Sequence, residues 1–240
     1  MFDHLRDLWA AVQDNVLFLV MCLLVFVGLF LAALAAEKLW LKTPKQSAAR
    51  RAAYIGVFGA IAAILMYWEF PLLFAPFFYE LDFSEVPVLI CSFSLGPVAG
   101  VVCEFVKILL KLVIKGTSTA FVGDFANFAT GCSFILPATV VYHRFKTRKG
   151  ALAGMAAGTG ALTVFGSLFN AVYLLPAFSE LYGMPLDQIV GIGTGINPAI
   201  TSVGTLVLLA VAPFNLVKGV VVSLLTFLLY KHIERLFRMR

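Results

Sequence analysis

The sequence predicts an all-α integral membrane protein built from seven spanning helices. Hydrophobic residues make up 61% of the 240 positions, charged residues make up only 13%, and the mean hydropathy is +0.97. Soluble domains do not have this composition. The stretch from Asn15 to Ala36 carries no charge and is long enough to cross a hydrocarbon core of roughly 30 Å. Basic residues gather in three short segments, as the positive-inside rule requires of a multi-pass protein.

The first predicted helix, over residues 15–36, is too long for the apolar core of a signal peptide, and no small-residue cleavage site follows it. We therefore expect this helix to remain in the protein. Six further apolar stretches predict a six-helix bundle, with the Gly96–Pro97 turn separating its second and third helices. These spans are expected at about 52–68, 86–102, 103–115, 124–142, 151–175 and 213–233.

The positive charges predict the orientation in the cell membrane. The three basic segments fall on one side if every predicted span crosses the lipid bilayer once, and that side is the cytoplasm. The N-terminus is then extracellular and the C-terminus cytoplasmic. The net charge of +5 therefore reports topology, and no nucleic-acid-binding face is expected. The basic segments hold Lys38, Lys42, Lys45, Arg50 and Arg51; Arg144, Lys146, Arg148 and Lys149; and Lys231, Arg235, Arg238 and Arg240.

The sequence offers no catalytic or metal-binding motif, so we do not expect an enzyme. A phosphate-binding loop, a nucleophile elbow and a zinc-protease motif are all missing from the chain. The four cysteines lie within apolar runs, where a cysteine usually acts as a small buried hydrophobe. The glycines between Gly191 and Gly195 lack the strand–turn–helix setting of a nucleotide loop, and we expect a flexible loop there.

Asn215 and Lys218 are the strongest candidates for ligand binding. They are three residues apart in an apolar segment, so a helix presents both on one face. A lysine inside a membrane segment requires a partner, a cavity or a ligand. If Pro213 is the first helical residue, Lys218 lies within two turns of a positive helix terminus, and a ligand acceptor or a nearby carboxylate must offset its charge. Asn170 either hydrogen-bonds between helices or faces this pair.

The segment from Trp68 to Pro87 is aromatic and irregular. Pro71 and Pro76 prevent a regular helix, and seven aromatic residues crowd the segment. It forms either an interfacial aromatic belt or a lid that stacks on a flat ligand. For Asp82 and Glu85 we favour a structural role at the start of the next helix, with Ser84 as the N-cap.

Other polar residues have both structural and functional interpretations. On one helix, Glu104, Lys107 and Lys111 form a stripe in which we expect an internal Glu104–Lys107 ion pair rather than a proton relay. Asp124 is expected in the first turn of a helix and Asn127 is a possible pocket residue. Small residues repeat every fourth position, as Ala52, Gly56 and Ala60 and as Gly59 and Ala63. Such repeats allow close helix packing, within the bundle or against a partner subunit.

The core from Ala52 to Phe237 resembles the riboflavin-specific S components of energy-coupling factor (ECF) vitamin importers. The most specific matching stretches are Leu81-Asp-Phe-Ser-Glu-Val-Pro87 and Ala212-Pro-Phe-Asn-Leu-Val-Lys-Gly219. Glu69-Phe-Pro, Glu104-Phe-Val-Lys107, Gly116-Thr117, Ala126-Asn-Phe128 and Asn197-Pro198 support them. The family fold has six helices, so residues 1–48 are expected to form an additional helix and a basic cytoplasmic linker. Residues 49–240 then form the substrate-binding domain.

The resemblance implies a transport role. Riboflavin is bound from outside as a transported ligand and not as a cofactor, and the S component joins a transmembrane T subunit and two ATPases. By resemblance, Asn215, Lys218 and Asn170 contact the flavin, with Phe70, Phe83 and Asn127 as further candidates. The small residues Ala52, Gly56, Gly59, Ala60 and Ala63 are the expected contact with the T subunit.

Two alternatives remain open at the level of sequence. The chain is an S component for another vitamin, or a membrane assembly subunit without a ligand. The predicted outer loops are acidic and nearly free of cations, which disfavours an anionic vitamin.

Overall fold

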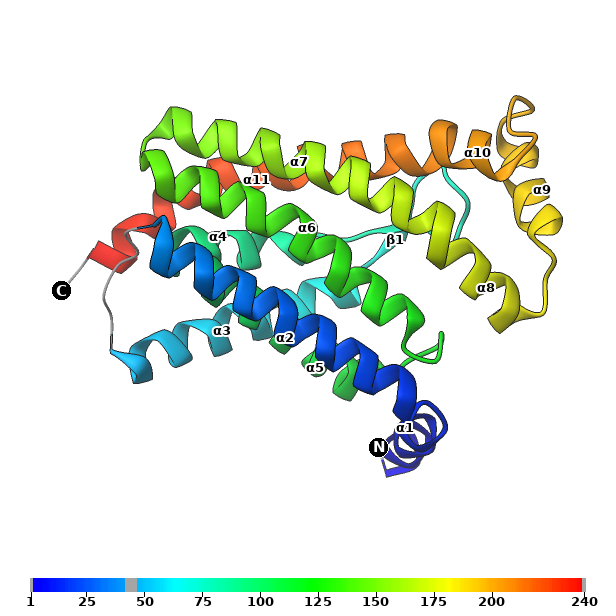
Figure 1. Cartoon of the computed structure of the whole chain (residues 1–240), viewed down its shortest axis with the longest axis horizontal. Coiled ribbons are helices and arrows are strands. Elements are labelled where there is room, and N and C mark those ends of the chain that lie inside the picture. Colours follow the sequence, from blue (N-terminus) through cyan, green and yellow to red (C-terminus); the bar gives the residue numbers. More distant parts are fainter. Residues whose placement is uncertain (1, 42–46, 239–240) are drawn as a thin grey trace.

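Long helices run side by side along most of the molecule in the computed structural model (Figure 1). The structure describes residues 2–41 and 47–238. The helices are α1 (Phe2–Asp14), α2 (Val16–Leu39), α3 (Ala48–Tyr67), α4 (Glu85–Leu95), α5 (Pro97–Lys115), α6 (Val122–Phe145), α7 (Arg148–Phe169), α8 (Leu175–Tyr182), α9 (Leu186–Ile196), α10 (Val203–Leu206) and α11 (Ala212–Arg238). Two π-helical segments, η1 (Asn170–Leu174) and η2 (Val207–Val211), join α7 to α8 and α10 to α11. Two short antiparallel strands, β1 (Phe70–Pro71) and β2 (Glu80–Leu81), lie between α3 and α4.

Five helical segments are long and apolar enough to cross a membrane. They are Val16–Leu39, Ala48–Tyr67, Val122–Phe145, Arg148–Tyr182 and Val203–Tyr230. The predicted spans at 15–36, 52–68, 124–142 and 151–175 match four of them. The fifth corrects the prediction for 213–233, because the helix begins ten residues earlier, at Val203. Pro213 is therefore inside a continuous helical path, and Lys218 is far from a helix terminus.

The predicted boundary between spans 86–102 and 103–115 is wrong. The helix ends at Leu95 and the next begins at Pro97, because Gly96 adopts a φ of 105° and Pro97 has no N–H to continue the first helix. The predicted Gly96–Pro97 turn is confirmed. With 11 residues, α4 is only about 16 Å long. It reaches across about half of a bilayer core, and the irregular residues 68–84 continue from it toward the end of the bundle that holds α8 and α10 (Figure 1).

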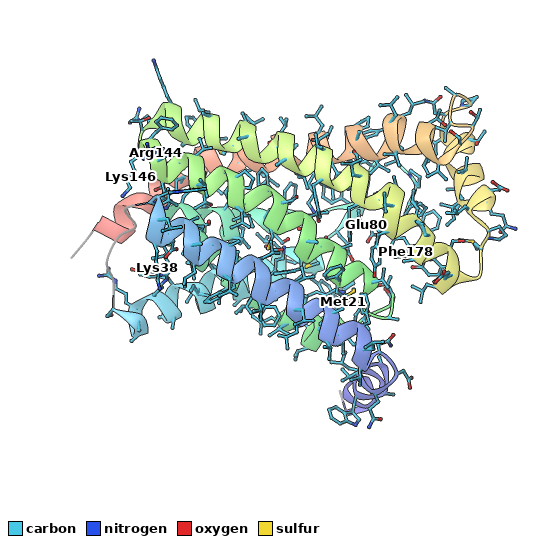
Figure 2. The ribbon with its side chains drawn as sticks, viewed as in Figure 1. Met21, Lys38, Glu80, Arg144, Lys146 and Phe178 are labelled. Carbon is cyan, nitrogen blue, oxygen red and sulfur yellow. The ribbon has the colours of Figure 1, made fainter. Side chains whose placement is uncertain are left out.

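The basic segments meet at one end of the bundle. Lys38, Arg144 and Lys146 lie together at the left of Figure 2, while Glu80 and Phe178 lie toward the other end. The C-terminus is also at the basic end (Figure 1). This arrangement matches the predicted charge asymmetry. Lys42, Lys45 and Arg240, which belong to the predicted cytoplasmic segments, are outside the described residues.

Helix α2 is attached to the bundle by apolar and polar contacts. Phe26 stacks on Phe105 of α5 with ring centroids 4.2 Å apart. Near the basic end, the Glu37 carboxylate accepts hydrogen bonds from the Val98 backbone N–H (2.9 Å) and from the Arg51 guanidinium (3.1 Å). One side chain of α2 thus caps the start of α5 and pairs with α3.

The segment from Gly191 to Gly195 is helical and not the expected flexible loop. It lies within α9, whose buried Ile189 and Val190 pack with Leu175, Ile200 and Leu206 in one apolar cluster. The apolar face of this helix, rather than its glycine content, decides its conformation.

Candidate functional site

A cavity of about 320 Å³ lies at the end of the bundle opposite the basic segments. This volume is at the lower end of the range found for small-molecule sites. Its walls come from the α3–α4 segment, α6, the α7–α8 path and α11. The wall residues include Phe77, Phe78, Tyr79, Glu80, Asn127, Asn170, Phe178, Tyr182, Phe214, Asn215 and Lys218.

Asn215 and Lys218 both line the cavity from α11, as their spacing predicted. Each is more than nine-tenths buried. Asn215 packs against Gly166 of α7, where an added Cβ would lie 2.7 Å from the amide nitrogen. Among the described residues, Asn215 Nδ2 has no hydrogen-bond partner. A buried amide of this kind is costly unless a partner arrives.

The charge of Lys218 is balanced by Asp82. Lys218 Nζ lies 3.0 Å from Asp82 Oδ2, and Asp82 Oδ1 accepts a hydrogen bond from the Ser84 N–H at 2.7 Å. The expected offset is therefore a carboxylate of the protein. The hydrogen bond to Ser84 agrees with the structural role favoured for Asp82 at the start of α4, and the ion pair with Lys218 adds a link from the irregular segment to α11. The Ser84 side chain makes no capping hydrogen bond.

Asn170 is held by Tyr79. The Tyr79 hydroxyl donates to Asn170 Oδ1 at 2.8 Å, and Asn170 Nδ2 donates to the Gly166 carbonyl at 2.7 Å. Neither hydrogen bond joins two helices, since Tyr79 lies in the irregular α3–α4 segment and Gly166 in the same helical path as Asn170. Asn170 instead lines the cavity beside Asn215, as the second interpretation expected. Because both ends of the amide are engaged, its orientation toward the cavity is fixed.

Both asparagines are next to the π-helical segments. Asn170 begins η1, and η2 ends four residues before Asn215. The two segments contact each other. Single π turns within α-helices recur at functional sites, where they redirect side chains. No pattern in the sequence predicted them.

Of the three remaining predicted ligand contacts, one lines the cavity and two do not. Asn127 lines the cavity and donates a hydrogen bond to the Gly123 carbonyl at 3.2 Å. Phe70 and Phe83 instead pack on each other, with ring centroids 5.8 Å apart, and neither is among the cavity wall residues. Sequence reasoning missed Phe178 and Phe214 as wall residues, although Phe214 directly precedes Asn215.

The lysines around the cavity are paired with acids. Lys111 lies 2.5 Å from Asp124, the expected first-turn acid of α6, and Lys115 pairs with Glu69. Glu80 faces the cavity and has no ion pair among the described residues; partial burial raises the pKa of its carboxyl. The wall therefore offers no unpaired cation within the described part of the chain.

The predicted Glu104–Lys107 ion pair is confirmed, and it contains a third member. Lys107 also lies 2.9 Å from Glu85, the first residue of α4. Glu85 is therefore an ion-pair partner in the bundle core, beyond its expected place in the first turn. All three side chains are almost fully buried.

The two small-residue repeats of α3 face different surroundings. Gly59 and Ala63 are buried, and an added Cβ at Gly59 would lie 2.7 Å from Val106 Cγ1 of α5. These two residues pack within the bundle, which corrects their assignment to a partner surface. Ala52 and Gly56 are exposed, Ala60 is half-buried, and a Cβ at Gly56 meets nothing within 4 Å.

Known proteins share this sequence and fold. The family described as "ECF transporter, substrate-specific component" matches residues 50–230. The riboflavin transporter RibU of Staphylococcus aureus (strain TCH60) is 34% identical over 79% of this chain and 93% of its own length. The riboflavin transporter FmnP of Bacillus subtilis (strain 168) is 31% identical over 73% of this chain and 87% of its own. A solved chain reported under "Structure and mechanism of the S component of a bacterial ECF transporter" has a TM-score of 0.63 and 34% identity, covering 80% of this chain and 99% of that one.

Proposed function

Because this chain belongs to the family of ECF transporter substrate-specific components, we propose that it binds riboflavin in the cavity around Asn215 for uptake into the cell. The relatives at 31–34% identity are named riboflavin transporters. The observation that carries the proposal is the buried Asn215 Nδ2, which has no hydrogen-bond partner in the described part of the chain and lies beside Lys218 and Asn170 within aromatic walls. The isoalloxazine ring is flat and has alternating acceptors and N–H donors at its edge, which suits these groups.

The charge of the cavity favours the uncharged vitamin over its phosphate. Lys111 and Lys218 each have a carboxylate partner, and Glu80 adds an acid that has no ion pair within the described residues. A phosphate entering this cavity meets a negative field without a free cation. The same argument disfavours vitamins that carry carboxylates.

The chain acts as the binding subunit of a larger importer in this proposal. We place the cavity on the extracellular side and the basic end in the cytoplasm, with the N-terminus outside. A T subunit and two ATPases supply energy, and the exposed Ala52 and Gly56, with Ala60, form the contact of α3 with the T subunit. Residues 1–48 are an addition to the binding domain, which begins at about residue 49.

Titration of the purified protein with riboflavin tests this function. Stacking on the aromatic walls should quench flavin fluorescence in a saturable manner, and the phosphorylated flavin should bind more weakly at moderate salt. A monodisperse, folded protein that gives no saturable quenching would contradict the proposal. Tighter binding of the phosphate form would contradict the charge argument alone.

A further inference from the structure

Among the described residues, the buried carboxyl groups of the bundle outnumber the lysines that face them by one; the buried His143 of α6 lies against the Ser92 carbonyl and is in no ion pair with these acids. Among the described residues, the acids are Asp82, Glu85, Glu104 and Asp124, and the bases that face them are Lys107, Lys111 and Lys218. Two lysines have one partner each, in Lys218–Asp82 and Lys111–Asp124. The excess acid is therefore in the third group, where Lys107 alone faces Glu85 and Glu104.

Glu85 and Glu104 converge on one point next to Gly131 of α6. A Cβ added at Gly131 would contact Oε1 of both carboxyl groups, so the glycine leaves the space that they occupy. The Lys107 ammonium donates a hydrogen bond to Glu85 Oε1 at 2.9 Å. Glu104 Oε1 is in the ion pair with the same ammonium. Glu85 Oε2 and Glu104 Oε2 are buried and have neither a hydrogen bond nor an ion pair among the described residues.

Among the described residues, the surrounding groups do not provide a second cation. The other ionisable side chains that interact electrostatically with members of this group are Asp82 in the α3–α4 segment, Cys91 on α4, Cys103 on α5 and Cys132 on α6. None of them carries positive charge. Two ionised carboxylates with one ammonium would leave a net negative charge in the bundle core, where an uncompensated charge is expensive.

We propose that Glu85 and Glu104 bind one proton between them. Both carboxyl groups face Lys107, and Glu104 carries the proton because its side chain is the more deeply buried of the two, where the charged form is disfavoured. The proton is taken up from the buffered solvent, whose acid form loses it, and forms an O–H bond on the Glu104 carboxyl, which donates to Glu85. Glu85 remains ionised and balances Lys107. The buried group is then neutral, and the oxygens that lacked a donor share one.

This site is connected to the cavity. Glu85 follows Asp82 by three residues, and Asp82 contacts Lys218 in the cavity wall. The proton thus sets the charge at one end of the segment whose other end contacts the proposed ligand site. The inference rests on the buried charges alone, so it stands or falls independently of riboflavin binding.

Infrared spectroscopy of the full-length protein tests the bound proton. At pH 8 the protein in detergent should show the C=O stretching band of a protonated carboxyl group, shifted in D2O. Glu104→Gln should remove the band. The control Glu69→Gln, which changes an acid paired with Lys115 outside this group, should retain it. No protonated carboxyl band in the unmodified protein overturns the proposal, as does a band that survives Glu104→Gln.

Thermal unfolding provides a second readout. Glu104→Gln imitates the protonated acid and should leave the unfolding temperature within a few degrees of the unmodified protein. The double variant Glu85→Gln/Glu104→Gln leaves Lys107 without a counter-charge and should unfold at a clearly lower temperature. A single Gln variant as unstable as the double variant means that Lys107 needs both carboxyl groups as charged partners, and it overturns the proposal. If Glu104→Gln does not fold, Glu85→Gln takes its place, because it also removes the shared proton and its band.

Discussion

At the scale of single residues, Asn215 and Lys218 of α11 differ in their polar partners within the protein. Asn215 Nδ2 has no partner among the described residues, whereas Lys218 is paired with Asp82. Removing the amide therefore affects mainly the ligand. Removing the lysine affects the protein as well, because it strands a buried carboxylate.

Asn215→Ala should weaken riboflavin binding by roughly five- to a hundred-fold. The loss of one hydrogen bond to a buried ring edge costs roughly 1–3 kcal/mol, and about 1.4 kcal/mol corresponds to a factor of ten. Fluorescence titration measures the affinity, and a thermal melt should show little change in stability. An unchanged affinity in a folded variant would show that the amide does not contact the flavin.

Lys218→Met should destabilise the fold and not only reduce binding. Breaking a buried ion pair on one side costs about 3–5 kcal/mol. The double variant Lys218→Met/Asp82→Asn removes both charges and should recover most of the lost unfolding temperature while riboflavin affinity stays low. If the single and double variants have the same unfolding temperature, the Lys218–Asp82 pair does not hold the α3–α4 segment to α11.

Tyr79→Phe should weaken riboflavin binding although Asn170 itself is unchanged, because the variant loses the hydroxyl that orients the Asn170 amide. The hydroxyl fixes the Asn170 amide, and a hydrogen bond of this kind is worth about 0.5–1.5 kcal/mol, or roughly a two- to twelve-fold change in affinity. Tyr67→Phe, an exposed tyrosine outside the cavity wall, is the matched control. Equal affinities for both variants would mean that the orientation of Asn170 does not depend on Tyr79.

At the scale of elements, α3 has an inner and an outer small-residue face. Gly59 packs on Val106 of α5, while the position of Gly56 is open. The sequence alone predicted both faces from the same fourfold spacing. It could not assign them, because the rotation of a helix about its axis depends on the neighbours that it packs against.

Gly59→Leu should therefore affect the stability of the fold, whereas Gly56→Leu should affect assembly with the T subunit. The first overpacks the bundle and should cost about 1–3 kcal/mol or more of stability. The second should leave the melt and the riboflavin affinity unchanged and weaken assembly with the T subunit, measured by co-purification. Normal assembly of Gly56→Leu would place the partner contact on another face.

Other elements show what the sequence can and cannot determine. The long spans and the Asn215–Lys218 pair follow from apolar length and from the i, i+3 spacing, which depend only on local order. The failures involve tertiary contacts. The span boundary was placed at 102–103, although the Gly96–Pro97 turn that ends the helix was itself predicted. Phe70 and Phe83 pack on each other because side-chain directions in an irregular segment follow no period. The helix α9 depends on a cluster formed with α8 and α10.

At the scale of the whole molecule, the basic residues, the cavity and the buried ion pairs lie in different parts of the bundle. Basic residues gather at one end, the opposite end contains the cavity, and paired charges lie in the bundle core. No nucleotide-binding motif is present in the sequence. In the proposed function, other subunits must therefore use the ATP.

Proteoliposomes containing only this chain should therefore bind riboflavin without accumulating it. Uptake against a gradient should require the T subunit, both ATPases and ATP, measured with labelled riboflavin. Vesicles that contain the ATPase partners but lack ATP are the control. Concentrative uptake by the chain alone would refute its role as a subunit that depends on others for energy.

The two π-helical segments determine which side chains of the following helices face the cavity. A π turn holds one residue more than an α turn, and one residue rotates a helix by about 100°. Phe178 lies beyond η1, while Asn215 and Lys218 lie beyond η2, so each reaches the cavity with an added residue upstream. Deleting one residue from either segment would keep the helix almost unchanged in composition, but it would rotate the helix that follows the segment, so that its cavity-lining side chains would point away from the cavity. The number of residues in these two segments is therefore as much a part of this site as the identity of its side chains.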